Sequence, residues 1–297
     1  MRLKPIAAFS FIVVAIFPYL VSCTDRVDDD KAGKKKNHTS PDGYDLTQPI
    51  AIKLPLELDE ISGVAYYAKD TSLFAIQDES GLLYKIPLNR PQNIEKWKYK
   101  KGADYEDVVL LNESFFVLVS NGDIVGVRFL SEDSIQESKF KFPFDKGSEF
   151  EILFYDATIN KLRLICKDCE SDKKKYLSGY LFDPVTHEYS EDPVRIDVQS
   201  ITALLGKDKM KFKPSAAAIN PATHELFIIS AINKLLVIVD KTGKAKEVHR
   251  LDKANFKQPE GLTFSPGGTM FISNEAADIG VANILIFPRK SLKDTAQ

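Results

Sequence analysis

The chain has 297 residues, of which 40 are basic and 42 acidic, so its formal net charge is −2. A nucleic-acid-binding domain carries a concentrated positive charge, and this balance gives no reason to expect a nucleic-acid partner. The run Lys173-Lys174-Lys175 is best explained as a solvated loop. After an N-terminal leader and spacer are subtracted, roughly 250 residues remain, which suits one large domain.

The N-terminus has the form of a lipoprotein signal. Residues 1–4 form a short start with two basic residues, Arg2 and Lys4, an apolar run extends from Pro5 to Val21, and Ser22-Cys23 follows. A basic start, an apolar segment and a small residue before the cleavage point are typical of a secretory signal. The ending Leu20-Val21-Ser22-Cys23 resembles the bacterial lipobox, in which cleavage leaves a lipid-bearing cysteine as the first residue. The alternative is an uncleaved membrane anchor, because the run is nearly long enough to span a bilayer.

We therefore expect a signal peptide over residues 1–22 and lipidation of Cys23, which would hold the protein on a membrane of the bacterial cell envelope. Residues 23–45 contain few apolar side chains and read as a flexible tether. The acidic residues after Cys23 resemble the surface-export signal of some Bacteroidetes lipoproteins, although a plain spacer explains them as well. The domain is expected to face the periplasm or the outside of the cell.

Five segments share one short motif and indicate a repeat. They lie about 45 residues apart, with one step about twenty residues longer, and such periods built from short strands are the mark of propeller blades. The segments are Glu60 to Ala65, Asp104 to Val109, Glu149 to Phe154, Lys213 to Ala218 and Gln258 to Phe264. Each continues as an apolar strand, a polar turn and a second strand, and no sustained helical period occurs. The sequence therefore predicts an all-β, five-bladed β-propeller with four-stranded blades over residues 46–290.

The last blade lacks an outer strand of its own. The unassigned run from Pro49 to Leu54 precedes the first motif, and pairing it beside Ile284 to Phe287 would close the ring and cover an open edge. The extra residues between the third and fourth motifs include Ser200 to Gly206, for which two helical turns are expected. We interpret them as a packed excursion on one rim; covering a binding surface is the alternative.

Apart from Cys23, the cysteines form the pair Cys166-Lys167-Asp168-Cys169. Outside the cytoplasm such a pair can close as a small disulfide loop or remain as two thiols, whereas redox motifs of this spacing need a βαβ context. His187 and His224 occupy matching turns, which favours a role in the turn over catalysis.

One set of residues could carry chemistry. The first strand of each propeller blade lines the central channel, so the equivalent positions Ser62, Glu106, Glu151, Ser215 and Glu260 should face one another, with Glu60, Asp104 and Glu149 on the same side. Converging carboxylates repel unless a hard cation with oxygen ligands neutralises them, and calcium suits this set better than zinc. Alternatively, each glutamate caps backbone N–H groups of the next blade and serves architecture alone.

Taken together, the motifs resemble the SdiA-regulated, YjiK-like family, distant relatives of the NHL-repeat propellers. The resemblance covers roughly Leu54 to Phe287 and rests on Glu60 to Val64, Phe150 to Leu153, Lys213 to Ala216 with Asn220-Pro221, and Gln258 to Leu262 followed by Ser273-Asn274-Glu275. It implies a five-bladed propeller in an envelope-anchored protein with a calcium site. Asp107 and Ile152 stand where the family usually has Gly.

Two function classes stay open. The favoured one is a calcium-containing binding or scaffold module for an unknown protein or small-molecule ligand, acting as a monomer and not as an enzyme. The alternative is a calcium-dependent hydrolase of the lactonase or esterase kind. The ring contains no His, and the residues after the second strands, Asp78-Glu79, Ser120-Asn121 and Asn274-Glu275, form no recognisable catalytic set.

Overall fold

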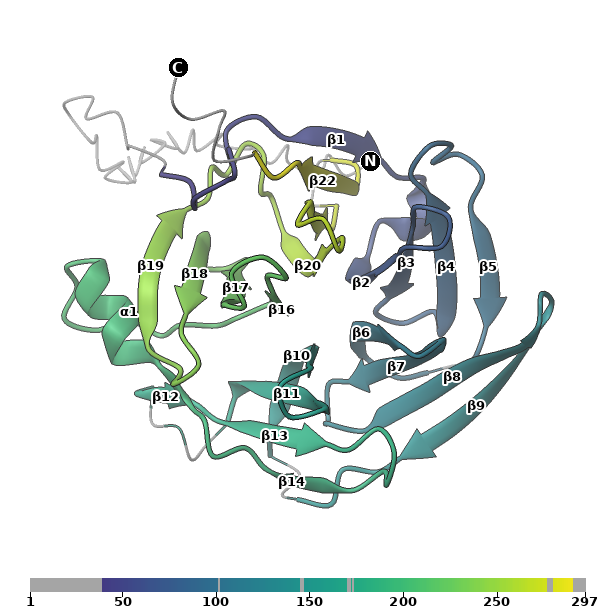
Figure 1. The fold of residues 1–297 in the computed structure, drawn as a ribbon, viewed down its shortest axis with the longest axis horizontal. Coiled ribbons are helices and arrows are strands. Elements are labelled where there is room, and N and C mark those ends of the chain that lie inside the picture. The colour runs from purple at the N-terminus through teal and green to yellow at the C-terminus, as the bar shows by residue number, and fades with distance from the viewer. Residues whose placement is uncertain are drawn as a thin grey trace, which may run out of the picture. The chain divides into compact units, whose positions relative to one another are not determined.

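A computed structural model describes residues 39–100, 102–144, 147–169, 172, 174–276 and 280–290. Within this part of the chain, five four-stranded antiparallel sheets are arranged around a central axis as the blades of a β-propeller (Figure 1). The predicted fold class is confirmed. The expected signal peptide and Cys23 lie outside the described residues.

Blades 1, 2 and 4 each consist of four consecutive strands, numbered outward from the axis. Blade 1 contains β2 (Ile61–Tyr67), β3 (Ser72–Gln77), β4 (Leu82–Pro87) and β5 (Glu95–Lys98). Blade 2 contains β6 (Tyr105–Leu111), β7 (Ser114–Val119), β8 (Ile124–Ser131) and β9 (Ser134–Phe140). Blade 4 contains β16 (Ala216–Ile219), β17 (Leu226–Ser230), β18 (Leu235–Val239) and β19 (Ala245–Arg250). The middle strands are covered on both faces and read as continuous apolar runs, whereas the outermost strands are largely exposed.

Blade 3 carries the extra residues. Its strands are β10 (Glu149–Asp156), β11 (Lys161–Asp168), β13 (Gly179–Phe182) and β14 (Tyr189–Glu191). The short strands β12 (Tyr176–Leu177) and β15 (Ile196–Asp197) pair separately, and the helix α1 (Val198–Leu204) follows. The helix begins earlier than expected because Asp197, not Ser200, is its N-cap. Ser200 instead accepts a hydrogen bond from the backbone N–H of Ala245 at 2.8 Å, which ties the helix to β19.

Blade 5 joins the two ends of the described chain. It consists of β20 (Pro259–Phe264), β21 (Met270–Asn274), β22 (Asn283–Phe287) and, on the outside, β1 (Ile50–Lys53) (Figure 1). Ile50 lies opposite Ile286 and Lys53 opposite Asn283, so the predicted closing strand is confirmed. A 3-10 turn, η1 (Leu56–Leu58), leads from β1 into blade 1.

The core is a ring of five clusters rather than one centre. Each cluster of buried apolar side chains lies between two neighbouring blades. Between blades 5 and 1, for example, Ile61 and Leu73 pack with Phe271 and Ile284. Every blade therefore depends on both neighbours to bury its faces, as expected for stacked repeats.

The chain packs against the propeller before the expected end of the tether at residue 45. Tyr44 is 6% exposed, and its hydroxyl donates to the carbonyl of Gly268 at 2.7 Å and accepts from the amide of Asn220 at 2.9 Å. Thr39 already contacts the ring of His249, at 3.0 Å between Oγ1 and Nδ1. Residues 39–45 thus bridge blades 4 and 5. Within the described residues, no helix has the length and apolar character needed to cross a bilayer.

Candidate cation-binding site

Each of the three motif glutamates is the extra residue of a β-bulge. Tyr105 lies opposite Val119 and Asp107 opposite Leu118, so Glu106 between them has no partner in the ladder. The ladders of β10 and β20 skip Glu151 and Glu260 in the same way. A bulge interrupts the alternation of a strand and re-aims a side chain. The three carboxylates are therefore presented by a repeated backbone device.

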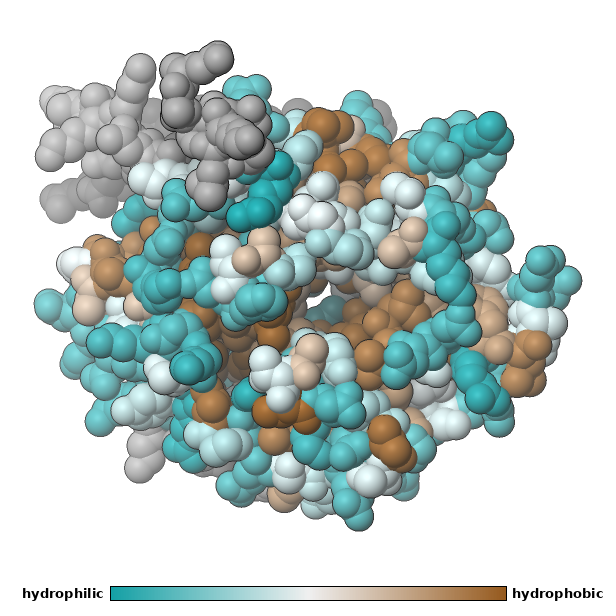
Figure 2. All heavy atoms as spheres, in the orientation of Figure 1, coloured by the Kyte–Doolittle hydropathy of each residue, from teal (hydrophilic) through white to brown (hydrophobic). Residues whose placement is uncertain are grey.

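The bulges bring the predicted residues to one place. Ser62, Glu106, Glu151, Ser215 and Glu260 all line a cavity of about 260 Å³ among the inner strands of the blades. Figure 2 shows the molecule hollowed at its centre. Of the residues expected on the same side, Asp104 lines the cavity, whereas Glu60 and Glu149 do not. The simple alternation that placed all three together is interrupted by the bulges.

The cavity also contains charged and polar residues outside the predicted ring. Asp78, Lys167 and Glu275 come from the ends of the second strands, and Lys213 and the neutral Gln258 from the approaches to the first. In an antiparallel hairpin the end of the second strand lies beside the start of the first, as the hydrogen bond from Asp78 N to Glu60 O shows at 3.3 Å. The polar residues that follow the second strands are the sequence feature that could have identified these cavity residues. Pairing the first and second strands of each blade brings them to the axial cavity.

Negative charge dominates this cavity. Six acidic side chains and two lysines line it. Burial, followed by the neighbouring Asp104, raises the pKa of Glu106 to about 8, and the charge of Lys167 opposes this rise. Burial and Glu275 raise the pKa of Glu260 to about 7, again against Lys167. Burial and mutual repulsion thus disfavour the ionised forms of both glutamates, and Lys167 offsets only part of this cost.

A second pair of carboxylates is perturbed in the same direction. Burial and then the charge of Glu60 raise the pKa of Asp78 to about 6. Burial and then Asp78 raise the pKa of Glu275 to about 6. The Oδ1 atom of Asp78 is buried and has no hydrogen-bond partner among the described residues. A buried acceptor without a donor is costly, and a bound cation would satisfy it.

Side chains other than the ring glutamates hydrogen-bond to the backbone of neighbouring blades. Asp107, next to Glu106, accepts from the backbone N–H of Val108 at 2.8 Å and from that of Leu153 at 2.9 Å, which links blade 2 to blade 3. Complete burial raises the pKa of Asp107 well above its ordinary value. The Ser215 hydroxyl donates to the carbonyl of Pro259 at 2.7 Å and links blade 4 to blade 5.

Close contact between blades explains the glycines of the motif. A Cβ atom on Gly63 would lie 2.5 Å from the Oδ1 atom of Asp107, and one on Gly261 would lie 2.6 Å from the carbonyl of Ser62. That carbonyl accepts from the Ser273 hydroxyl at 2.8 Å, which links blade 5 to blade 1. Only a residue without a Cβ atom fits at either position. The serine positions of the ring therefore contribute mainly to the joints between blades.

The donor set fits a hard cation. It consists of carboxylate oxygens without His or Cys, and Ca²⁺ takes six to eight oxygen ligands in flexible geometry. The carboxylates do not form a closed cage in this conformation. Among the described residues, only Cys166, Cys169 and Asp172 bring three possible ligand atoms within 4.8 Å of one another. A calcium ion would therefore need water ligands or movement of the glutamates toward it.

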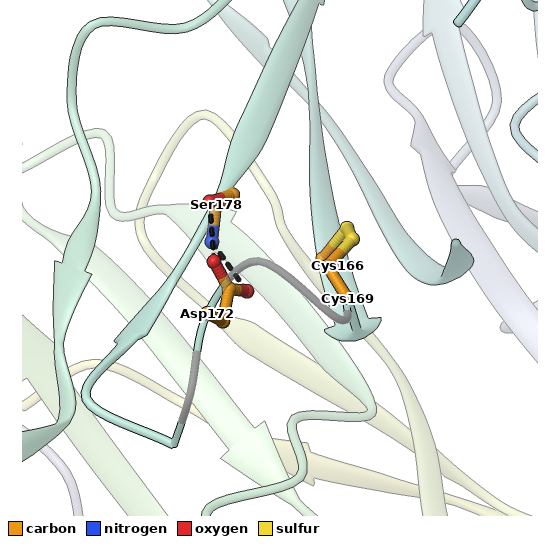
Figure 3. The surroundings of a disulfide bond; sticks show 4 residues. All are labelled: Cys166, Cys169, Asp172 and Ser178. Atoms are coloured by element: carbon orange, nitrogen blue, oxygen red, sulfur yellow. Dashed lines mark hydrogen bonds between the residues drawn. A yellow bond between two sulfur atoms is a disulfide. The ribbon is translucent and has the colours of Figure 1, made fainter. Parts of the chain in front are cut away.

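The cysteine group is explained without a metal. Cys166 and Cys169 are joined in a disulfide, with their Cα atoms 5.8 Å apart. Asp172 points toward Ser178 (Figure 3), whose backbone N–H donates to it at 2.9 Å and whose hydroxyl also contacts it. The sulfur atoms and the carboxylate are thus already engaged.

A second cavity, of about 480 Å³, lies between blades 3 and 4 and has a largely apolar lining. Its Arg163 is held by Asp156, at 3.0 Å, and by Asp192. None of the buried side-chain atoms without a partner in the described residues belongs to this cavity. The axial cavity is therefore the better candidate for a functional site.

The histidines serve turns. His187 and His224 both have a positive φ, of 63° and 57°. Their backbone N–H groups donate to the carbonyls of Asp183 and Asn220, each at 2.8 Å. Neither contributes to the axial cavity.

Comparison with solved structures supports the fold. The glutaminyl cyclase of Myxococcus xanthus is 13% identical and superposes with a TM-score of 0.53, covering 82% of this chain and 98% of that one. A luciferin-regenerating enzyme is 11% identical with a TM-score of 0.50, covering 82% and 96%. At these identities the likeness concerns the fold alone. A search of curated protein sequences gives no significant match.

A family model gives the more specific result. The model described as SdiA-regulated matches residues 44–278, which span every blade from the start of blade 1 to the second strand of blade 5. The match includes all five motif positions and the disulfide loop. The chain belongs to the SdiA-regulated family.

Proposed function

We propose that this protein is an envelope-anchored lipoprotein whose propeller holds a calcium ion at its axis and acts as a binding or scaffold module. The observation that carries the proposal is the cluster of six acidic side chains in one axial cavity. Burial and neighbouring carboxylates raise the pKa values of four of them, Asp78, Glu106, Glu260 and Glu275, so their ionised forms are disfavoured unless a further positive charge enters the cavity.

Glu106, Glu151 and Glu260 would hold the ion, and Ser62, Ser215, Asp78 and water are the further oxygen donors at hand. When bound, calcium would neutralise the ring and link strands of different blades. The protein's own residues prepare the site, because the bulges direct the glutamates inward and the joints made by Asp107 and Ser215 hold the inner strands together.

Calorimetric titration of the soluble part, His38 to Gln297, with calcium tests this assignment. We expect saturable binding of one ion and a higher melting temperature, because a ligand that binds only the folded state stabilises it. If the titration gives only the heat of dilution and chelation does not change the melting temperature, the protein does not bind calcium and the assignment is wrong. A pull-down with the same protein then tests for a binding partner.

The envelope location rests on the N-terminal sequence. Replacing Cys23 with Ala should block lipoprotein processing and leave an uncleaved precursor, detected by gel mobility and lipid labelling. A normally processed, lipid-bearing product from this variant would contradict the assignment.

A second candidate function is a calcium-dependent lactonase or esterase. The raised pKa of Glu106, about 8, and of Glu260, about 7, places both near the working range of a general base. The cavity offers no His beside them, which favours binding over hydrolysis. A panel of lactones and esters, tested with and without calcium, separates the two functions.

A further inference from the structure

The lysine of the disulfide loop lies inside the glutamate ring. Lys167 is next to Cys166 in β11, lines the axial cavity and forms an ion pair with Glu151. The carboxylate side of this pair is nearly buried, with the Glu151 side chain 10% exposed. The ring thus already contains one positive charge, supplied by the chain itself.

The backbone that carries this lysine is fixed on both sides. Cys166 is joined to Cys169, and its N–H donates to the carbonyl of Ser178 at 2.9 Å. On the other side, Asp168 is held by Lys211 at 2.7 Å and by Lys213 at 3.2 Å. The ammonium group therefore enters the cavity from a fixed base on a flexible four-carbon stem.

The charge of Lys167 acts beyond its direct partner. Glu106 of blade 2 and Glu260 of blade 5 line the same cavity as Lys167 and Glu151 of blade 3, and the charge of Lys167 opposes the rise in the pKa of both. The ammonium group is therefore placed among carboxylates from three blades.

We propose that Lys167 is the tethered counter-cation of the ring, and that it sets the affinity of the axial site by competing with a divalent metal ion for Glu151. The inference rests on the proposed calcium site. Without the ion, Lys167 neutralises part of the ring. When the ion enters, the ammonium group must leave Glu151 and remain near a second positive charge, which weakens binding. Such a site is occupied at high calcium concentrations and stays empty at low ones.

The test compares two lysines of the same cavity. Lys167→Met removes the competing charge, whereas Lys213→Met removes an equal charge from the same lining but from a lysine whose ion-pair partner is Asp168, outside the ring. Calcium affinity is measured by calorimetry and by melting over a calcium series, so that a variant destabilised without calcium is still measured. Lys167→Arg, which keeps the charge, is the conservative variant.

We expect Lys167→Met to tighten calcium binding about tenfold or more, as removal of a unit charge a few ångströms from the ion should do. The same variant should melt at a lower temperature than wild type in chelator. Lys213→Met should change affinity by no more than about threefold, because Lys213 pairs with the exposed Asp168 and not with a ring glutamate, and Lys167→Arg should bind like wild type.

Tighter calcium binding together with a lower melting temperature in chelator would identify Lys167 as the counter-cation of the ring. A lysine that served only the packing of the loop would lower stability at every calcium concentration without tightening binding. Equal dissociation constants for wild type and Lys167→Met would overturn the inference while leaving the calcium site in place. Absence of calcium binding in wild type and in all three variants would instead refute the proposed function.

Discussion

At the scale of single residues, the inner strand of blade 2 divides two tasks between neighbouring positions. The bulged Glu106 lines the axial cavity, whereas Asp107 makes the joint to blade 3. Glu151 and Glu260 are bulged in the same way, whereas at the equivalent position of blade 4 Ser215 itself makes the joint. Asp107 occupies the position that Gly63 has in blade 1, and its own Oδ1 atom lies where a Cβ atom on Gly63 would come within 2.5 Å of it.

This division predicts the effect of Asp107→Ala. The change leaves the buried N–H groups of Val108 and Leu153 without acceptors, and each such loss costs about 1–3 kcal/mol. We expect the free energy of unfolding, measured by urea denaturation, to fall by about 2–4 kcal/mol. An unchanged midpoint would show that the joint between blades 2 and 3 does not depend on Asp107.

Glu260→Gln should have the opposite effect on stability. Because burial and Glu275 raise the pKa of Glu260 to about 7, its ionised form is disfavoured in the folded state. The neutral amide should therefore raise the melting temperature in chelator at pH 8 and weaken calcium binding by about tenfold or more. Glu149→Gln is the matched control, since Glu149 is exposed and does not line the cavity. Equal effects of the two changes would contradict the assignment of Glu260.

At the scale of elements, the sequence predicts strands and blades well and bulges poorly. Turn residues and apolar runs identify each strand. Because blade 5 has only three strands at the C-terminal end of the chain, the unassigned run that forms β1 is predicted as its fourth. A bulge depends on the register of two strands, which no single segment encodes. Asp104 lines the cavity and Glu60 and Glu149 do not, although the inner strands of all three blades carry a bulge. The position of Lys167 in the cavity likewise depends on the pairing of β10 with β11.

The dependence on contacts between distant segments also explains why the N-terminal tether ends earlier than expected. Residues 39–45 have the composition of a spacer, yet Tyr44 inserts between blades 4 and 5, where its hydroxyl satisfies Asn220 and Gly268. One aromatic residue in a polar stretch gives little signal of burial. Its partners lie more than 170 residues away in the sequence.

A chain that begins at Leu56 should therefore be unstable. It loses β1, which pairs with β22, together with the Tyr44 contacts, and a loss of several kcal/mol, about half the stability of a typical domain, is expected. A chain that begins at His38 keeps both features and should melt like the full protein. Identical melting of the two shortened chains would rule out closure by β1.

At the scale of the whole molecule, stability should depend on pH through the axial carboxylates. The folded pKa values of Glu106 and Glu260 lie above 4.5, the ordinary value of a glutamate side chain. Between that value and about 7 to 8 the folded state binds more protons than the unfolded state, so stability present at low pH is lost as the pH rises through this window. Asp78, Asp104, Glu275 and Lys167 line the same cavity, and the pKa values of Asp78 and Glu275 are also raised, each to about 6.

The melting temperature in chelator should therefore fall from pH 5 to pH 8. Calcium should remove most of this fall, because the ion stabilises the ionised carboxylates. Differential scanning calorimetry at several pH values, with calcium and with chelator, measures both curves. Parallel curves would mean that calcium does not act on these groups.

The most direct test of the axial site is a crystal structure of the protein grown with calcium, with diffraction collected at long wavelength. We predict an anomalous peak in the axial cavity, within bonding distance of oxygens from Glu106, Glu151 and Glu260. We also predict that the Lys167 ammonium group no longer contacts Glu151. A cavity without such a peak at saturating calcium, with Lys167 still paired to Glu151, would contradict both predictions.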